Sequence, residues 1–198
     1  MTAIIISLLI YNTGFEAGGE LISMIPLGKD IGNFSPTITW GSELGIRNVL
    51  PGIGFDLGVR HFCIESVASD DTLKQDKQWN GFFIDASAIF ESWPYWNSFM
   101  GLRLKTGTTV SSWKMLTNGK LIAISPTDTN SNTTYTYMKA TNFGLLLGGN
   151  LMFRPIDFLI VDIGFTHRYL FSMDKDKFGK KDVDEGFLEV YLGTRFRF

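Results

Sequence analysis

Residues 186–198 read GFLEVYLGTRFRF, and apolar and polar side chains alternate along this stretch. Successive side chains of a β-strand point to opposite faces, so the alternation predicts an extended strand with one apolar and one polar face. The apolar positions are Leu188, Val190, Leu192, Phe196 and Phe198. The opposite face carries Glu189, Tyr191, Arg195 and Arg197. This charged face therefore meets either water or a polar interior.

The same alternation recurs upstream and predicts eight strands in all. The expected strands lie at residues 15–25, 36–47, 53–65, 80–90, 98–111, 139–153, 158–171 and 186–198. Each is close to the nine or more residues that a tilted membrane-spanning strand requires. No segment reaches the roughly 18 apolar residues of a transmembrane helix. Any membrane span in this sequence is therefore expected to be a strand.

The connections between these strands are expected to alternate in length. Short connections are expected at residues 48–52, 91–97 and 154–157, and longer ones at 26–35, 66–79, 112–138 and 172–185. Short turns on one rim and long loops on the other are typical of outer-membrane barrels, with the short turns in the periplasm. We therefore predict an all-β fold over residues 14–198, a single closed antiparallel up-and-down eight-stranded transmembrane β-barrel.

The polar faces of the predicted strands carry equal numbers of acids and bases. The acids are Glu16, Glu20, Glu43, Asp56, Asp85, Asp162 and Glu189. The bases are Arg47, Arg60, Arg103, Lys105, Arg168, Arg195 and Arg197. A soluble carrier barrel would point its apolar face inward, whereas a membrane barrel points it outward to lipid. Because buried charges are tolerated only when paired, the matched sets favour the membrane barrel and predict a lumen charge network.

Aromatic residues cluster near both predicted rims, as they do at membrane interfaces. The expected girdle comprises Trp93, Tyr95 and Trp96 at the short-turn rim, and Trp40, Trp79, Trp113, Tyr169 and Phe171 at the long-loop rim. The glycines of the strands, such as Gly144 and Gly148, are interpreted as sites of curvature or close packing.

The first residues have a different character from the predicted barrel. Residues 3–11 (AIIISLLIY) have the size of a secretory signal core, but no basic residue precedes them. We interpret residues 1–13 as the remnant of a truncated signal peptide. The alternative is an ordinary buried first strand.

Composition argues against several functional classes. The 198 residues have a net charge of −2, which gives no reason to expect a nucleic-acid partner. A single Cys excludes an internal disulfide and a Cys-clustered zinc site. The one weak catalytic candidate combines His61, Cys63 and Glu65 with His167 and Ser172, and spacing gives these groups no more than a shared face. We therefore expect no catalytic residue, no metal site and no cofactor.

Together these features resemble the small eight-stranded outer-membrane barrels, the group of OmpA-, OmpX- and OmpW-type proteins. The resemblance covers residues 14–198 and rests on architecture and on the C-terminal strand. It implies that Leu188, Val190, Leu192, Phe196 and Phe198 form the signal that the barrel-assembly machinery reads. It also implies location in the outer membrane of a diderm bacterium, with outer-membrane lipid and lipopolysaccharide as partners.

Several functions are compatible with such a barrel. The first hypothesis is a structural or surface-interaction role, with a charge-paired lumen and long loops that contact a host surface molecule. The alternative is a narrow pore or OmpW-like transport of small apolar molecules. A soluble lipocalin-like carrier and a lipid A-modifying enzyme are the remaining interpretations. The Ser/Thr/Asn-rich segment 125–137 and the charged segment 174–185 are expected to be solvated loops.

Overall fold

The computed structural model describes residues 13–27, 35–65, 77–92, 99–121, 123–124, 136–137, 139–171 and 185–198. Eight long strands are present: β1 (Gly14–Leu27), β2 (Thr37–Leu50), β3 (Ile53–Glu65), β4 (Lys77–Glu91), β5 (Met100–Thr117), β9 (Lys139–Ile156), β10 (Leu159–Phe171) and β11 (Glu185–Arg197). Three short strands are β6 (Lys120–Leu121), β7 (Ala123–Ile124) and β8 (Thr136–Tyr137). Among the described residues, no helix has the length and apolar character needed to cross a membrane.

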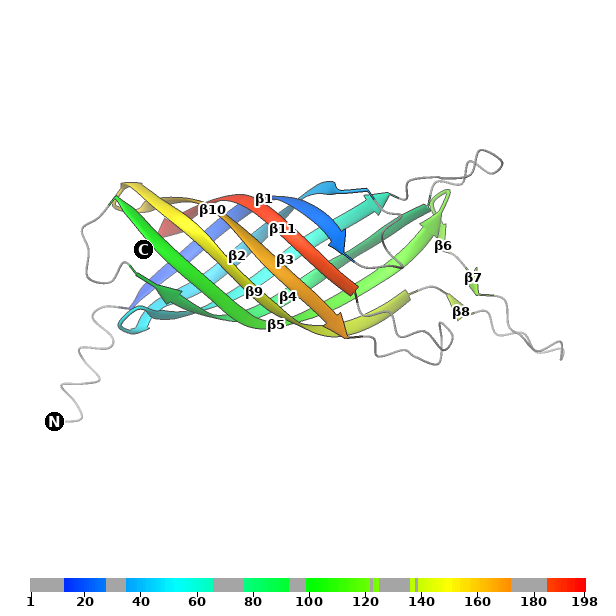
Figure 1. Ribbon diagram of the computed structural model, residues 1–198, viewed down its shortest axis with the longest axis horizontal. Helices are drawn as coiled ribbons and strands as arrows, with labels where there is room; N and C mark the ends of the chain where they lie inside the picture. The colour runs from blue at the N-terminus through cyan, green and yellow to red at the C-terminus, as the bar shows by residue number, and fades with distance from the viewer. Residues whose placement is uncertain are drawn as a thin grey trace.

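The eight long strands close into one barrel (Figure 1). Hydrogen-bonded neighbours run from β1 through β5 to β9, β10 and β11, and β11 pairs back with β1. All of these pairings are antiparallel. Closure removes the free edges that an open sheet would present. The predicted fold class, a closed antiparallel eight-stranded barrel, is confirmed.

The two ends of the barrel differ in their connections. At the turn end, Pro51 and Gly52 join β2 to β3, and Asp157 and Phe158 join β9 to β10. The first and last strands also meet there, because the backbone amide of Phe198 donates to the Phe15 carbonyl at 2.9 Å. At the opposite loop end, β5 continues toward β6, with β7 and β8 beyond it (Figure 1).

Two strand boundaries differ from the prediction in ways that matter for the interior. Strand β5 runs to Thr117, so the expected loop 112–138 begins inside the sheet. It then turns at Asn118 and Gly119, whose φ angles of 49° and 76° suit a two-residue hairpin turn. Strand β4 includes Glu91, which the prediction had placed in a connection. Segments 125–135 and 174–184, parts of the two expected surface loops, lie outside the described residues.

The outer surface of the barrel is apolar. Leu57 and Leu147, for example, are 64% and 63% exposed, because the outward face of each strand carries its apolar side chains. An apolar exterior of this extent fits lipid and would be costly in water. The interpretation as a soluble lipocalin-like carrier requires the opposite arrangement of faces and is therefore wrong.

Candidate functional site

The candidate site is the interior of the barrel, where all the charged residues expected in the lumen point inward. Thirteen of these fourteen residues are buried, and the side chain of the fourteenth, Arg197, is 18% exposed at the turn end. The structure adds Glu91, which is also buried. On the inward face of the described strands, eight carboxylates thus accompany seven basic side chains.

A first cluster of charges lies at the turn end, where three arginines hold two carboxylates. Glu16 accepts hydrogen bonds from Arg47 Nε and Arg103 Nη2, both at 2.8 Å, and from Arg197 Nε at 2.7 Å. Glu91 accepts from Arg103 Nε at 2.8 Å and from Arg197 Nη2 at 3.0 Å. Arg47 Nε also lies 3.2 Å from Glu91 Oε1. Glu91, which the sequence analysis places in a connection, is therefore a central hydrogen-bond acceptor of this cluster.

Asp56 belongs to the same cluster through one contact. Its Oδ1 forms an ion pair with Nη1 of Arg47, a residue of the neighbouring strand β2. The cluster thereby draws side chains from β1, β2, β3, β4, β5 and β11 into one layer across the barrel. Charge-assisted contacts of this kind fix the positions of the strands that supply them.

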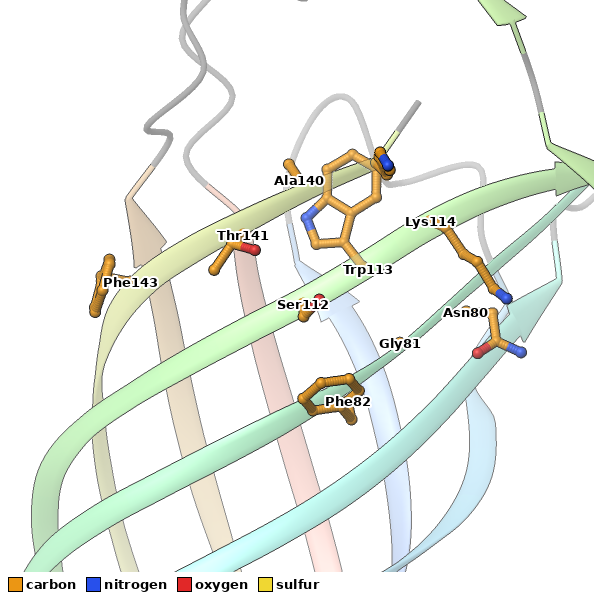
Figure 2. Close-up of a pocket in the computed structure, with 10 residues that line it drawn as sticks. Asn80, Gly81, Phe82, Ser112, Trp113, Lys114, Ala140, Thr141 and Phe143 are labelled. Atoms are coloured by element: carbon orange, nitrogen blue, oxygen red, sulfur yellow. The ribbon is translucent and has the colours of Figure 1, made fainter. Parts of the chain in front are cut away.

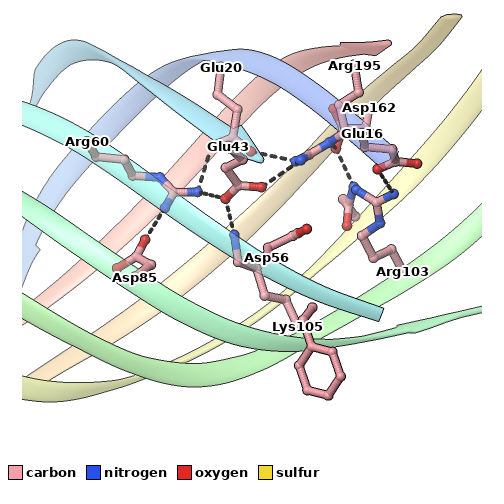
Figure 3. A network of polar contacts seen from close by, with 12 residues as sticks. Glu16, Glu20, Glu43, Asp56, Arg60, Asp85, Arg103, Lys105, Asp162 and Arg195 are labelled. Carbon is pink, nitrogen blue, oxygen red and sulfur yellow. Dashed lines mark hydrogen bonds and ion pairs between the residues drawn. The ribbon is translucent and has the colours of Figure 1, made fainter. Parts of the chain in front are cut away.

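A second cluster fills the middle of the barrel around Arg60 (Figure 3). Arg60 Nη2 donates to Glu20 Oε2 at 2.7 Å and also to Glu43, while Nη1 donates to Asp85. Its Nε lies 3.5 Å from Glu189 Oε2. One guanidinium group therefore meets carboxylates from four other strands, β1, β2, β4 and β11.

Glu43 and Arg195 link further residues to this second cluster. Arg195 donates to Glu43 Oε2 and Glu20 Oε1, both at 2.6 Å, and its Nε lies 3.1 Å from Asp162 Oδ2. Lys105 Nζ donates to the other Glu43 oxygen. The Glu43 carboxylate thus contacts one lysine and two arginines, so its burial is compensated several times over.

Arg168 lies at the boundary between the charges and an apolar region. Its Nε donates to Glu189 Oε1 at 2.6 Å, and its Nη2 donates to Asp85 Oδ2 at 2.7 Å. Its Nη1 donates to the hydroxyl of Thr109 at 2.9 Å. The guanidinium carbon also lies 4.7 Å from the centre of the Phe83 ring, a cation–π distance.

An aromatic cluster occupies the interior toward the loop end. Its buried members are Met24, Phe62, Ile64, Trp79, Phe83, Trp113, Leu170 and Phe187. Ring centres are 4.7 Å apart for Phe62 and Phe83, and 5.6 Å apart for Trp79 and Trp113. Stacked and edge-on contacts at these distances add to the stabilisation from burial alone.

This cluster corrects the predicted aromatic girdle. Trp79 and Trp113 point inward, because they share the face of Asp85 in β4 and of Arg103 in β5. Other members of the expected girdle do face outward, namely Trp40, Tyr169 and Phe171. Trp93, Tyr95 and Trp96 lie outside the described residues.

Inward-facing glycines provide space for the charged side chains. A Cβ at Gly58 would lie 3.3 Å from both Arg60 Nη1 and Glu43 Cγ. At Gly144 and Gly148 the added atom would meet backbone carbonyls of the adjacent strand β10. Close strand approach at these two positions agrees with the sequence interpretation. Near the charges, the side chains of Arg60 and Glu43 occupy the space that is free because Gly58 has no side chain.

The weak catalytic candidate is not assembled. His61, Cys63 and Glu65 lie on the outward face of β3, and His167 lies on the outward face of β10, four strands away around the barrel. Ser172 lies outside the described residues. Among the residues that the structure describes, no group of three His, Cys, Asp or Glu side chains is placed to hold a metal ion.

An apolar exterior, an ion-paired interior and eight closed strands define the class of the protein as a membrane-spanning β-barrel of the outer-membrane type. Known structures share this fold. The barrel is similar to OprG from Pseudomonas aeruginosa, with a TM-score of 0.58 and 8% identity over 94% of this chain and 95% of that chain. It is also similar to a major outer membrane protein from Thermus thermophilus, with a TM-score of 0.56 and 14% identity over 94% and 100%.

A third similar structure is Neisserial surface protein A, with a TM-score of 0.55 and 12% identity over 94% of this chain and 97% of that chain. At such identities the likeness establishes the fold alone. The resemblance to small eight-stranded outer-membrane barrels is confirmed at that level. No protein-family model matches the sequence, and no curated protein matches it.

Proposed function

We propose that this protein is an integral outer-membrane barrel with an interior closed to ions and a structural or surface-contact role. The observation that carries the proposal is the presence of two buried ion-paired clusters between the turn end and the aromatic cluster. The turn end is then periplasmic and the loop end faces the cell exterior. The barrel performs no chemistry of its own.

The arrangement of the interior supports a closed barrel. An ion that enters from the loop end would first meet a buried apolar cluster of eight side chains. Beyond it, the ion would have to displace arginines that each contact several carboxylates. Separating such a buried ion pair costs about 3–5 kcal/mol, because each charge is then left buried without its partner.

Planar-bilayer recording tests this proposal. We expect no stable conductance from the purified barrel, with heat-dependent gel mobility used to show that the same preparation is folded. Reproducible single channels would contradict the proposal and favour the narrow-pore alternative. In that case Arg103→Ala, which leaves Glu16 and Glu91 with one cation fewer, should change ion selectivity.

A second part of the proposal concerns assembly. We propose that the outward residues of β11, together with Phe198 directly after it, form the signal for the barrel-assembly machinery, because Val190, Leu192, Phe196 and Phe198 are 43%, 54%, 46% and 80% exposed. A Phe198→Ser variant should then lower the fraction of folded barrel in the membrane several-fold. Phe158→Ser is the matched control, since this residue at the turn end is 54% exposed but lies in the connection between β9 and β10. Equal loss in both variants would contradict the signal.

A further inference from the structure

A groove of about 860 Å³ lies over β4, β5 and β9 near the loop end (Figure 2). The outward side chains that line it change in character from the middle of the barrel toward the loop end. In that order they are the apolar Phe82 and Phe143, the hydroxyl-bearing Ser112 and Thr141, and the cationic Lys114 and Lys139.

The strand register sets the positions of these three tiers: Phe82 shares a cross-strand row with Ser112 and Thr141, and Phe143 lies two residues from Thr141 toward the middle of the barrel. Ser112 of β5 lies opposite Phe82 of β4 on one side and opposite Thr141 of β9 on the other. Two residues further along, Lys114 lies directly opposite Lys139. Because side chains in a strand alternate between faces, a step of two residues keeps each tier on the outer surface. The tiers are therefore built into the sheet.

The lysine pair is an unfavourable arrangement for the barrel alone. Like charges directly opposite each other on antiparallel strands are destabilising. Both lysines are exposed, and within the described part of the chain no acidic side chain pairs with either ammonium group. Asn80, which lies opposite Lys114 on β4, is neutral. An anion between the two ammonium groups would relieve the repulsion.

A second groove, of about 680 Å³, gives a useful contrast. It lies at the turn end over β1 to β4, and the side chains at its outward edge include Phe15, Leu44, Phe55 and Phe198. Its lining contains no lysine or arginine, and its charged members Glu16 and Asp56 point into the barrel, where both pair with Arg47. This surface fits acyl chains alone, whereas the groove at the loop end combines an apolar edge with fixed positive charge.

We propose that the groove at the loop end binds a phosphorylated lipid of the surrounding leaflet. The phosphate lies between Lys114 and Lys139, and the sugar or glycerol oxygens contact the hydroxyls of Ser112 and Thr141. An acyl chain lies along the apolar edge. The order of the tiers matches that of such a lipid from its tail to its headgroup. This site rests on the membrane-spanning position of the barrel and does not depend on the closed interior.

Native mass spectrometry of the purified barrel in detergent micelles tests the site. The probes are lipid A with two phosphates, lipid A with one phosphate, phosphatidylcholine and inorganic phosphate. The wild-type barrel should bind both anionic lipid A forms more tightly than phosphatidylcholine, whose phosphate is already balanced by its choline cation. Lys114→Gln and Lys139→Gln should each weaken that binding about fivefold, the effect expected for one lysine at a membrane surface. Lys120→Gln, which removes an exposed charge of β6 outside the groove, should leave binding unchanged.

Three results would overturn the site. They are equal affinity for phosphatidylcholine, equal loss in the Lys120→Gln control, and binding of inorganic phosphate as tight as that of the lipid. Conductance is recorded on the same preparations, so that the two proposals are separated. If the barrel conducts ions but keeps its preference for lipid A, only the proposal of a closed interior is contradicted. If the barrel does not conduct and shows no preference for lipid A, only the lipid site is contradicted.

Discussion

The two halves of the barrel interior are stabilised by different interactions. Toward the turn end, buried charges contact opposite charges on other strands, often several at once, as Arg60 does with Glu20, Glu43 and Asp85. Toward the loop end, Phe62, Trp79 and their neighbours pack through rings without charge. The charged half depends on every partner being present, whereas the aromatic half depends mainly on volume.

This difference has consequences for how substitutions act. Removal of one member of an ion-paired cluster leaves several buried charges with one partner fewer, so the cost exceeds that of one contact. A change of ring size removes contacts in proportion to the atoms lost. The charged half should therefore be the less tolerant of substitution.

The largest effect is expected for Arg60→Met, which keeps much of the side-chain volume and removes the charge. Glu20, Glu43 and Asp85 each lose a partner, so the free energy of unfolding should fall by about 3–5 kcal/mol in urea titrations of the folded barrel. The control is Arg154→Met, whose ion pair with the fully exposed Asp157 should be worth less than about 1 kcal/mol. Equal effects at the two sites would remove the distinction between the halves.

A smaller effect is expected in the aromatic half for Phe62→Leu. Leucine remains apolar but loses ring contacts with Trp79, Phe83 and Phe187, whose ring centres lie 5.7, 4.7 and 6.1 Å away. The same urea titration should show a loss of about 1–2 kcal/mol. A loss as large as that of Arg60→Met would mean that both halves are equally intolerant.

The smallest effect is expected for the coupling between two residues at the boundary of the halves. A double-mutant cycle of Arg168→Met and Phe83→Leu should give a coupling of about 1 kcal/mol, because the guanidinium group lies over the ring. The control cycle pairs Phe83→Leu with Arg103→Met in the turn-end cluster, for which a coupling near zero is expected. Coupling of equal size in both cycles would show that the interior responds as one unit.

Much of this architecture follows from alternation in the sequence. The period of two places the fourteen predicted charges on one face of their strands, and a one-residue shift of any strand would move all of its charges to the outer face. The same rule assigns Trp79, Trp113 and Glu91 to the interior, since they share the parity of Asp85 and Arg103. Parity along the strand therefore predicts the inward position of these residues better than proximity to a rim does.

Two other features differ in how far the local sequence predicts them. The Asn118 and Gly119 dipeptide is itself a strong hairpin signal, and it accounts for the extension of β5 into the expected loop. The partners of each charge are a different matter. Arg195 and Glu20 are 175 residues apart, and their contact depends on closure of β11 against β1. Pairing across the barrel requires the three-dimensional register, which no single strand encodes.

The glycines that face the charges also limit how the sequence can change. A side chain at Gly58 would need the space that Arg60 and Glu43 occupy, and one at Gly193 would compete with Asp162 and Glu20. Substitution at such a glycine is therefore compatible with the fold only when a charged neighbour becomes smaller, and that neighbour's partners must then change as well. Across related sequences, these glycines and charges should covary as groups, so that the interior evolves in coordinated steps while the outer face changes one residue at a time.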